Sequence, residues 1–150
     1  MAGTFTNLQY HLVFSTKAWR PSISDAIRPR LYEYMGGIVR TAKGIVYEIG
    51  GMADHVHLLI RWRADKSVSD LLRDLKSNSS RWVHETFPNK KTFAWQDGYG
   101  AFTVSQSRSA DVKAYIADQP RRHRKFDFKA EFIGLLQAHG VEYDERYIWK

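Results

Sequence analysis

Hydrophobic and polar residues alternate along several short segments of the chain, which is the pattern of half-buried β-strands. Residues 8–15, 45–50 and 55–63 fit three strands, and the alternation is strongest in residues 55–63. Residues 92–105 are also strand-like, around the glycine-rich turn WQDGYG. The sequence therefore predicts four strands.

Two amphipathic helices are predicted in the intervals between these strands. The first is expected to begin near Pro29, which helices tolerate only in the first turn, and to end at Gly44. The second is expected to begin near Ser67, which forms a capping box with Asp70 in place of the usual Glu. Their apolar residues recur at helical spacing, as Leu31, Tyr34, Met35, Ile38 and Val39 in the first helix and Val68, Leu71, Leu72, Leu75 and Trp82 in the second.

Further helices are predicted after the last strand. One is expected from Ser109 to a point before Pro120, and another over residues 129–139, while the tail 141–150 is expected to dock as a strand. The order strand, helix, strand, strand, helix, strand is the split pattern of ferredoxin-like folds. The sequence thus predicts a single α+β domain over residues 1–150. We expect an antiparallel βαββαβ sheet with two helices on one face and additional C-terminal helices, one of which carries Tyr115.

Composition excludes several kinds of protein and site. The 150 residues include no cysteine, so a disulfide scaffold, a thiolate zinc site and a cysteine nucleophile are ruled out. No apolar run approaches the roughly 20 residues that cross a bilayer, and the first residues lack the pattern of a signal peptide. We therefore expect a soluble, cytoplasmic protein with no membrane partner.

Charge gives the first indication of a partner. The chain has 23 Lys and Arg against 16 Asp and Glu, a formal charge of +7, and its pI is about 9.7. A small basic domain is attracted to polyanions, of which nucleic acid is the commonest inside cells. The same charge also fits a merely well-solvated surface, so it leaves nucleic-acid binding open.

The strand at residues 55–63 separates two kinds of side chain, because alternate residues of a strand share a face. His55 and His57 are expected on the open face, where two imidazoles separated by one residue can bind one metal ion. The alternative is a pair of ordinary surface histidines. The other face, which the two helices cover, is expected to receive Val56, Leu58, Ile60 and Trp62.

A tyrosine and a glutamine share one side of the third predicted helix. Tyr115 and Gln119 are four residues apart and therefore stack along that side. The amide oxygen of Gln119 can serve as a neutral third ligand for Mg²⁺ or Mn²⁺, and the hydroxyl of Tyr115 can attack a phosphorus atom whose oxygens the metal holds. The alternative is a packed stripe of Val112, Tyr115, Ile116 and Gln119.

Four segments carry a family resemblance: YHLVFSTKAWR near the start, DHVHLLI in the middle, then WQDGYGAFTVS and VKAYIADQ. In this order and at this chain length, they resemble the single-tyrosine HUH transposases of insertion sequences that move as single-stranded DNA, the IS-two-hundred-like group. The REP-associated tyrosine transposases are relatives of that group. HUH denotes His, a bulky hydrophobic residue and His, which here are His55, Val56 and His57. The resemblance spans nearly the whole chain.

The resemblance implies a role for four residues. His55, His57 and Gln119 match metal ligands, and Tyr115 matches a nucleophile that cuts single-stranded DNA, stays bonded to the 5′ phosphate and releases a 3′-OH. The energy of the broken bond is retained, so no nucleotide cofactor is implied. The implied cofactor is a divalent metal, Mg²⁺ or Mn²⁺. The implied partners are single-stranded DNA with hairpin ends and a second copy of the chain, in a homodimer.

Other residues are candidates for DNA contact or for support of the histidines. His11 can share the open face with the pair, and Asp54 can orient an imidazole. The alternatives are a hydrogen-bonded sheet histidine and an aspartate that caps the turn after Gly51, and for Asp54 the turn is favoured. The basic candidates for salt-sensitive phosphate contacts are Lys17, Arg20, Arg121, Arg122, Arg124 and Lys125.

Three other functions fit parts of the sequence. A domesticated relative would bind a DNA hairpin without mobilising DNA, although only catalysis needs all four matched residues. An RNA-binding ferredoxin-like module would display aromatic residues where the third strand offers histidines. A histidine phosphoesterase would carry two His-containing motifs, and one is visible here. We therefore expect a metal-dependent tyrosine transposase, and the sequence identifies no general base for it.

Overall fold

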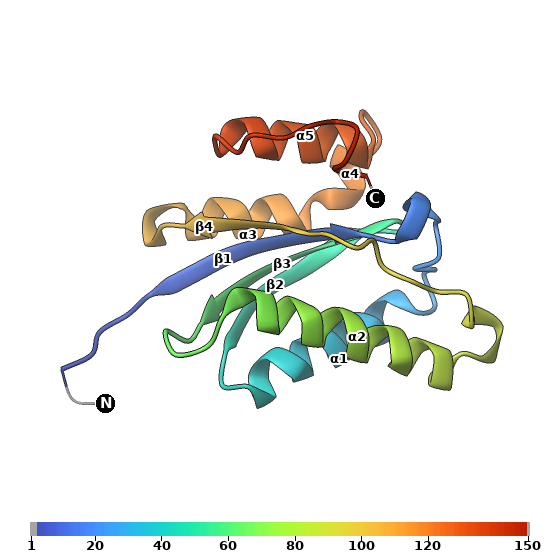
Figure 1. Cartoon of the computed structure of the whole chain (residues 1–150), viewed down its shortest axis with the longest axis horizontal. Coiled ribbons are helices and arrows are strands. Elements are labelled where there is room, and N and C mark those ends of the chain that lie inside the picture. Colours follow the sequence, from blue (N-terminus) through green and yellow to red (C-terminus); the bar gives the residue numbers. More distant parts are fainter. Residues whose placement is uncertain (1–2, 150) are drawn as a thin grey trace.

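A computed structural model describes residues 3–149 of the chain, so the ends of the expected domain, residues 1, 2 and 150, lie outside the described residues. The described part has three layers (Figure 1). Two long helices cover one face of a β-sheet, and three shorter helices from the C-terminal part of the chain cover the other.

The sheet has four antiparallel strands in the order β2-β3-β1-β4. The expected α+β class with an antiparallel sheet is confirmed. The fourth strand is shorter than expected, because residues 96–99 form a loop and Trp95 makes only an isolated bridge to Thr16. The strands are β1 (Leu8–Ser15), β2 (Ile45–Met52), β3 (His55–Trp62) and β4 (Gly100–Val104).

The helices follow the predicted order. On one face of the sheet lie α1 (Arg28–Thr41) and α2 (Val68–Thr86), and on the other lie α3 (Ser109–Ala117), α4 (Gln119–Arg122) and α5 (Phe128–Ala138). The predicted cap of α2 is confirmed, because the Ser67 hydroxyl accepts a hydrogen bond from the Asp70 amide at 3.1 Å. Three short turns of 3-10 helix complete the chain: η1 (Lys17–Trp19), η2 (Pro88–Lys90) and η3 (Gln106–Arg108).

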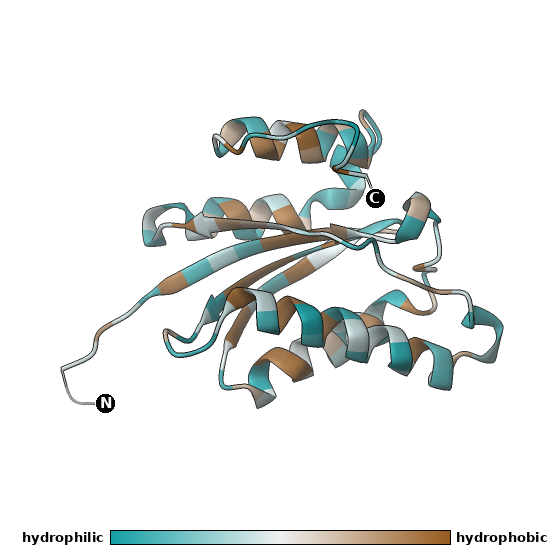
Figure 2. Ribbon diagram, in the orientation of Figure 1, coloured by the Kyte–Doolittle hydropathy of each residue, from teal (hydrophilic) through white to brown (hydrophobic). Residues whose placement is uncertain are grey.

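The main core lies between the sheet and helices α1 and α2, where the apolar side of each element faces inward (Figure 2). The predicted inward residues of β3 are all buried there, and Leu58 and Ile60 have no exposed surface. Burial of one such side chain contributes about 1.5–3 kcal/mol. The main members of this core are Leu12, Phe14, Leu31, Met35, Val39, Val56, Leu58, Ile60, Trp62, Leu71, Leu72 and Leu75.

The first helix ends differently from the prediction. It stops at Thr41, and the residue in left-handed conformation is Lys43, with φ of 70°, rather than Gly44. The Gly44 amide closes the end by donating to the Val39 carbonyl at 2.9 Å, as in a Schellman motif. A Cβ atom on Gly44 would lie 2.8 Å from Val39 Cγ1 and 2.9 Å from the Trp62 ring. Close packing, and not the backbone angle, therefore requires glycine here.

The C-terminal tail is not the strand that was expected. Residues 141–149 contain no strand, and Asp144 instead accepts hydrogen bonds from the backbone and side chain of Arg146 in a local turn. Tyr143, Ile148 and Trp149 pack on a second cluster built from α5 and the sheet. The tail therefore packs on the apolar surface of α5 and does not pair with an edge strand of the sheet. The buried members of that cluster are Val13, Phe102, Phe128, Phe132 and Leu136.

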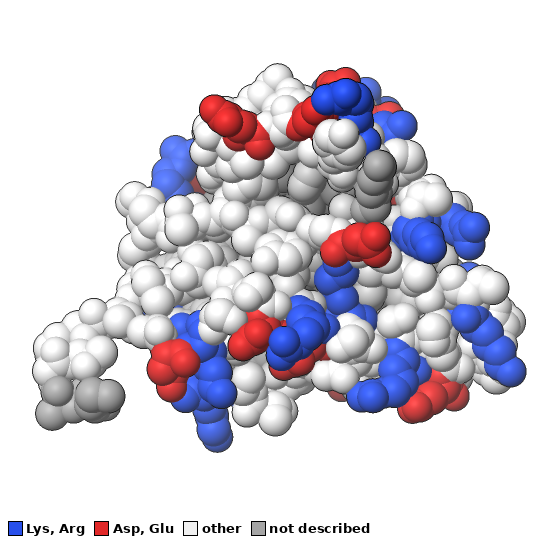
Figure 3. All heavy atoms as spheres, in the orientation of Figure 1, with Lys and Arg blue, Asp and Glu red and all other residues white. Residues whose placement is uncertain are grey.

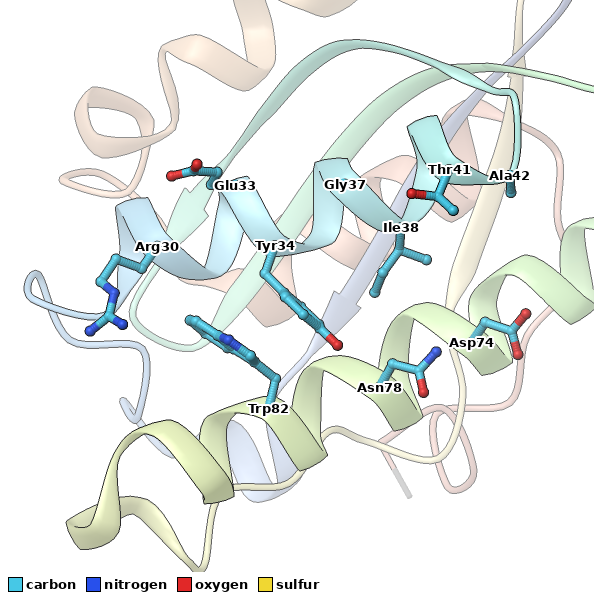
Figure 4. Close-up of a pocket in the computed structure, with 10 residues that line it drawn as sticks. All are labelled: Arg30, Glu33, Tyr34, Gly37, Ile38, Thr41, Ala42, Asp74, Asn78 and Trp82. Atoms are coloured by element: carbon cyan, nitrogen blue, oxygen red, sulfur yellow. The ribbon is translucent and has the colours of Figure 1, made fainter.

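A groove of about 720 Å³ lies between α1 and α2, on the far side of the sheet from the C-terminal helices (Figure 4). Tyr34 and Trp82 stack in it with ring centroids 4.9 Å apart, and Arg30 lies 5.8 Å from the Trp82 ring. Its charged residues have both signs, and Figure 3 shows Lys and Arg interspersed with Asp and Glu over the same helical layer. The groove is large, but its lining has no excess of positive charge that would indicate a binding site for a polyanion.

No helix within residues 3–149 has the length and apolar character that would carry it across a membrane.

Two glycines, one after the end of α1 and one within it, test the packing argument. Gly44→Ala is expected to lower the free energy of unfolding by about 1–3 kcal/mol, because the added methyl group clashes with Val39 and Trp62. The control is Gly37→Ala in α1, where nothing lies within 4 Å of the added carbon. It should raise stability by up to about 1 kcal/mol, because alanine favours a helix. Urea unfolding measures both, and equal effects would contradict the packing argument.

Candidate active site

His55 and His57 lie on the face of β3 that points away from the main core, as the alternation predicts. That face is not open, because the three C-terminal helices cover it (Figure 1). Both histidines have 0% exposed surface. Buried polar groups need partners, so the contacts of the two imidazoles decide what the site can do.

The Nδ1 atom of each of these two histidines has a polar partner. Asp54 Oδ1 lies 2.8 Å from His55 Nδ1, and His11 Nε2 lies 2.8 Å from His57 Nδ1. His11 also stacks on the His57 ring, so it shares this face of the sheet. Burial lowers the pKa of His11 to about 3, with a further contribution from His57, and keeps His11 neutral. Asp54 thus orients an imidazole, whereas the sequence favoured only a turn, and both Nε2 atoms are left to face a common space.

A carboxylate from α5 enters that common space. Glu131 is 5% exposed, and its Oε1 lies 3.0 Å from His57 Nε2 and 3.4 Å from His55 Nε2. One ligand atom from each of these three residues lies within 4.8 Å of the others, which is close enough to hold one ion. The sequence analysis did not find Glu131. Its one local signal is an acidic residue among the apolar side chains of α5.

Gln119 and Tyr115 meet the same carboxylate. Gln119 Nε2 donates to Glu131 Oε2 at 2.7 Å, and the Tyr115 hydroxyl donates to the same oxygen. Gln119 Oε1 lies 2.7 Å from His55 Nε2. The prediction that one helix carries both residues is wrong in detail, because α3 ends at Ala117 and Gln119 begins α4. Pro120 has no amide hydrogen and cannot continue the helical hydrogen bonds.

His123 is a second residue that the sequence analysis missed. Its Nε2 lies 3.0 Å from Gln119 Oε1 and 3.1 Å from Glu131 Oε1, and its ring centroid lies 4.6 Å from that of His55. It stands four residues after Gln119 in the basic stretch PRRHRK, so helical spacing was the available signal.

The charges of the site follow from these contacts. Burial alone would raise the pKa of Glu131, but hydrogen bonds from His123 and His57 outweigh it and hold that pKa far below its usual range. Burial lowers the pKa of His57. Burial and the hydrogen bond to Glu131 raise the pKa of Tyr115. The site therefore pairs an ionised carboxylate with a neutral His57 and a protonated tyrosine.

The predicted basic residues do not form one cluster around the site. Arg122 is the nearest, with its guanidinium carbon 4.5 Å from the centroid of the Tyr115 ring. Arg121 pairs with Asp118 at 2.7 Å. A cavity of about 660 Å³ lies beside them, lined by Asp111, Ala114, Tyr115, Ala117, Asp118, Arg121 and Arg122. The other four, Lys17, Arg20, Arg124 and Lys125, are exposed in the turns after β1 and α4.

The residues present fit a divalent ion. Neighbouring ligands at about 2.1 Å from a small octahedral ion stand about 3.0 Å apart. The measured separations of 3.0 Å between His57 Nε2 and Glu131 Oε1, and 3.4 Å between His55 Nε2 and Glu131 Oε1, are close to this value. Two imidazoles and a carboxylate are donors that Mn²⁺ accepts, while oxygen donors suit Mg²⁺.

Gly50 brings the tyrosine helix close to the histidines. It pairs directly with His57 across the sheet. A Cβ atom on Gly50 would lie 2.4 Å from the carbonyl oxygen of Ile116, the residue that follows Tyr115. The absence of a side chain at position 50 of β2 therefore allows α3 to lie against the sheet.

The chain matches the family described as "Transposase IS200 like" over residues 4–119. It is 26% identical over 122 residues to the ISDra2 transposase TnpA of Deinococcus radiodurans, covering 78% of this chain and 87% of that protein. It is 28% identical over 124 residues to the transposase for insertion sequence element IS200 of Salmonella typhimurium, covering 79% and 81%. The protein therefore belongs to the IS200-like transposase family, as the resemblance of its motifs indicated.

Solved structures agree with this fold. A crystal structure of a transposase from Deinococcus radiodurans has a TM-score of 0.67 at 27% identity, with 79% of this chain and 95% of that chain covered. A REP-associated tyrosine transposase bound to a REP hairpin has a TM-score of 0.60 at 13% identity, with 82% and 74% covered. The latter likeness concerns the fold.

The close approach at Gly50 generates a prediction. Gly50→Ala is expected to lower the free energy of unfolding by about 1–3 kcal/mol and to speed amide exchange in α3, because the methyl group clashes with the Ile116 carbonyl. The control is Gly134→Ala in α5, where nothing lies within 4 Å of the added carbon. Chemical denaturation and hydrogen exchange check both, and unchanged exchange in α3 would contradict this account of its position.

Proposed function

We propose that this chain is a DNA transposase that cuts and rejoins single-stranded DNA at the ends of an insertion sequence. Tyr115 is the nucleophile and a divalent ion at His55 and His57 is the cofactor. The observation that carries the proposal is the position of Tyr115 in the buried site of its own chain. Its hydroxyl donates to Glu131, and its ring centroid lies 5.8 Å from that of His57. The match to the IS200-like family supports it.

The reaction follows from the groups present. The Tyr115 oxygen attacks a phosphorus atom of the DNA, forming a 5′-phosphotyrosine, while the bond to the 3′ oxygen breaks and that oxygen takes a proton. The proton that leaves Tyr115 as the new bond forms balances the one that the 3′ oxygen takes, so the step consumes no proton overall. A Mg²⁺ or Mn²⁺ ion, when bound, polarises the phosphate and stabilises the charge on its oxygens. A later 3′-OH attacks the phosphotyrosine and rejoins the strands, so no nucleotide cofactor is consumed.

His55, His57 and Gln119 are the proposed ligands from the matched part of the chain. Their arrangement is fixed before any ion binds, since Asp54 and His11 hold the two rings at their other nitrogens. The Asp54 carboxylate accepts from His55 Nδ1 and so leaves Nε2 of that ring for the ion. Gln119 Oε1 lies 2.7 Å from His55 Nε2, and Glu131 Oε1 lies 3.0 Å from His57 Nε2. Both oxygens accept hydrogen bonds, so an ion takes the place of the protons that they face.

Arg122 is the basic residue best placed to meet the DNA near Tyr115. Its guanidinium lies over the tyrosine ring and borders the 660 Å³ cavity. Its Nε lies 3.6 Å from Asp118 Oδ2 and has no hydrogen-bond partner among residues 3–149. A phosphate in that cavity would supply one. Lys17, Arg20, Arg121, Arg124 and Lys125 are proposed as more distant backbone contacts, and their contribution depends on salt.

The proposal includes the expected setting of the protein, a cytoplasmic homodimer acting on DNA with hairpin ends. A second candidate is a protein that binds a DNA hairpin without mobilising DNA. The structural likeness to a REP-associated tyrosine transposase bound to a REP hairpin favours hairpin recognition under either function. Covalent chemistry at Tyr115 distinguishes the two.

The nucleophile is tested by a covalent adduct. The protein is mixed with labelled single-stranded DNA that carries the ends of its flanking element, with Mg²⁺ or Mn²⁺, and run on a denaturing gel. Tyr115→Phe should abolish the adduct and leave DNA binding largely intact, because only the attacking oxygen is removed. The control is Tyr99→Phe, since Tyr99 is 40% exposed in a loop. A normal adduct from Tyr115→Phe would refute the assignment, and tight binding without an adduct in the unaltered protein would favour the second candidate.

The histidine pair is tested by metal affinity. His57→Ala should weaken Mn²⁺ binding at least about tenfold in calorimetry, because it removes one ligand and leaves the others in place. His139→Ala serves as the control, since His139 is an exposed histidine just after α5. Equal affinities for His57→Ala and the unaltered protein would remove His57 from the ligand set.

A further inference from the structure

The family match ends at residue 119, whereas α5 begins at Phe128. Helix α5 nevertheless contacts the histidine pair, and Glu131 is the side chain of α5 that meets their Nε2 atoms. That carboxylate is surrounded by His55, His57, Tyr115, Gln119 and His123. The part of the chain beyond the family match thus supplies the central charge of the site.

We propose that Glu131 is a ligand of the divalent ion through Oε1 and positions the Tyr115 hydroxyl beside that ion through Oε2. The positioning role rests on the function proposed above for Tyr115. The ligand role does not, because it concerns the ion alone.

The two oxygens of the carboxylate face different groups. Oε1 faces the metal-binding side, 3.0 Å from His57 Nε2 and 3.4 Å from His55 Nε2. Oε2 accepts from the Tyr115 hydroxyl and from Gln119 Nε2. A single carboxylate can bind an ion with one oxygen and accept hydrogen bonds with the other. Glu131 therefore fixes the distance between the ion and the nucleophile.

The ion also needs the charge that Glu131 brings. Two imidazoles and an amide are neutral ligands, and Mg²⁺ prefers oxygen donors and carboxylates in particular. Without Glu131, the matched residues would leave both positive charges of the ion uncompensated inside a buried site. A carboxylate in direct contact offsets half of that charge, and Glu131 is already buried with its Oε1 facing both imidazoles.

The helix holds the carboxylate in place. Asp127 caps α5 by accepting a hydrogen bond from the Ala130 amide at 3.0 Å. Phe128, the first residue of the helix, stacks on His55 with centroids 4.4 Å apart, and Phe132 packs against Phe128. These contacts on both sides of Glu131 fix its backbone relative to the histidine pair. A ligand that is placed by packing in this way loses little freedom when the ion binds.

The opposite interpretation is that Glu131 only fills the space that an ion or a phosphate takes in the active protein. The two interpretations predict opposite effects on metal affinity. Removal of a ligand weakens binding of the ion, and removal of a competing group strengthens binding or leaves it unchanged.

Calorimetry of Mn²⁺ binding to the full chain, without DNA, distinguishes the two. Glu131→Gln should weaken Mn²⁺ at least about tenfold. Glu145→Gln is the matched control, since it removes the same charge from an exposed position in the tail. Tyr115→Phe should bind Mn²⁺ within about twofold of the unaltered protein, because the hydroxyl is not a ligand. Unchanged or tighter binding by Glu131→Gln would overturn the proposal.

The positioning role is tested at saturating Mn²⁺. An amide has one oxygen, so Glu131→Gln cannot place one oxygen at the ion and a second oxygen at the Tyr115 hydroxyl. The adduct should therefore form at least about tenfold more slowly in Glu131→Gln even when excess Mn²⁺ fills the site. Full recovery of the rate by excess Mn²⁺ would refute the positioning role.

A measurement on the unaltered protein covers the case in which Glu131→Gln does not fold. Crystals soaked in Mn²⁺ should show the ion about 2.2 Å from Glu131 Oε1 and bound to both histidines. An ion held by His55 and His57 with the carboxylate out of bonding range would overturn the ligand role. Absence of an adduct in the unaltered protein refutes the proposed function alone, whereas a normal adduct with unchanged Mn²⁺ affinity in Glu131→Gln refutes this inference alone.

Discussion

The two-residue period of β3 is the constraint on which the rest of the structure depends. It sends Val56, Leu58 and Ile60 to one face of the sheet and His55 and His57 to the other. The apolar face is satisfied by α1 and α2, which need only present apolar stripes. The histidine face has the stricter requirement, because any element that buries two imidazoles must also supply partners for their ring nitrogens. The C-terminal helices meet this requirement with Gln119 and Glu131, and the neighbouring strand meets it with His11.

Burial of a charge among these groups is tolerable because every part of the carboxylate is used. Glu131 contacts three imidazoles through Oε1 and accepts from Tyr115 and Gln119 through Oε2. An isolated ionised carboxylate at this depth would cost several kcal/mol, and the cost falls only when such partners are in place. The same partners are the groups that the proposed chemistry requires. The polar network that allows the C-terminal helices to pack on the sheet therefore also brings together the proposed nucleophile and the proposed ligands.

The sequence predicted most of the fold and the four residues that meet around Glu131, namely His55, His57, Tyr115 and Gln119. Residues close together in the sequence determine the strand at residues 8–15, the cap at Ser67 and the two faces of β3. The structure agrees with these three predictions. The end of the first helix depends on packing of Gly44 against Trp62, and the conformation of the tail depends on packing against α5. Patterns of residues close in the sequence do not record such contacts. Glu131 was missed for the same reason, since it stands 74 positions from the histidine it contacts. A lone carboxylate in an apolar helix is a faint signal beside a motif such as His-x-His.

The covered site limits how DNA can reach the nucleophile. The metal-facing nitrogens are fully buried under α3, α4 and α5, whereas one side of Tyr115 borders the cavity that Arg122 lines. Under the proposed function, a scissile phosphate therefore approaches along α3 and α4, where Arg122 can neutralise it. The Tyr115 hydroxyl points inward in the resting site, toward Glu131. Attack on a phosphate from that position requires the ion and the phosphate to meet on the inner side of the tyrosine.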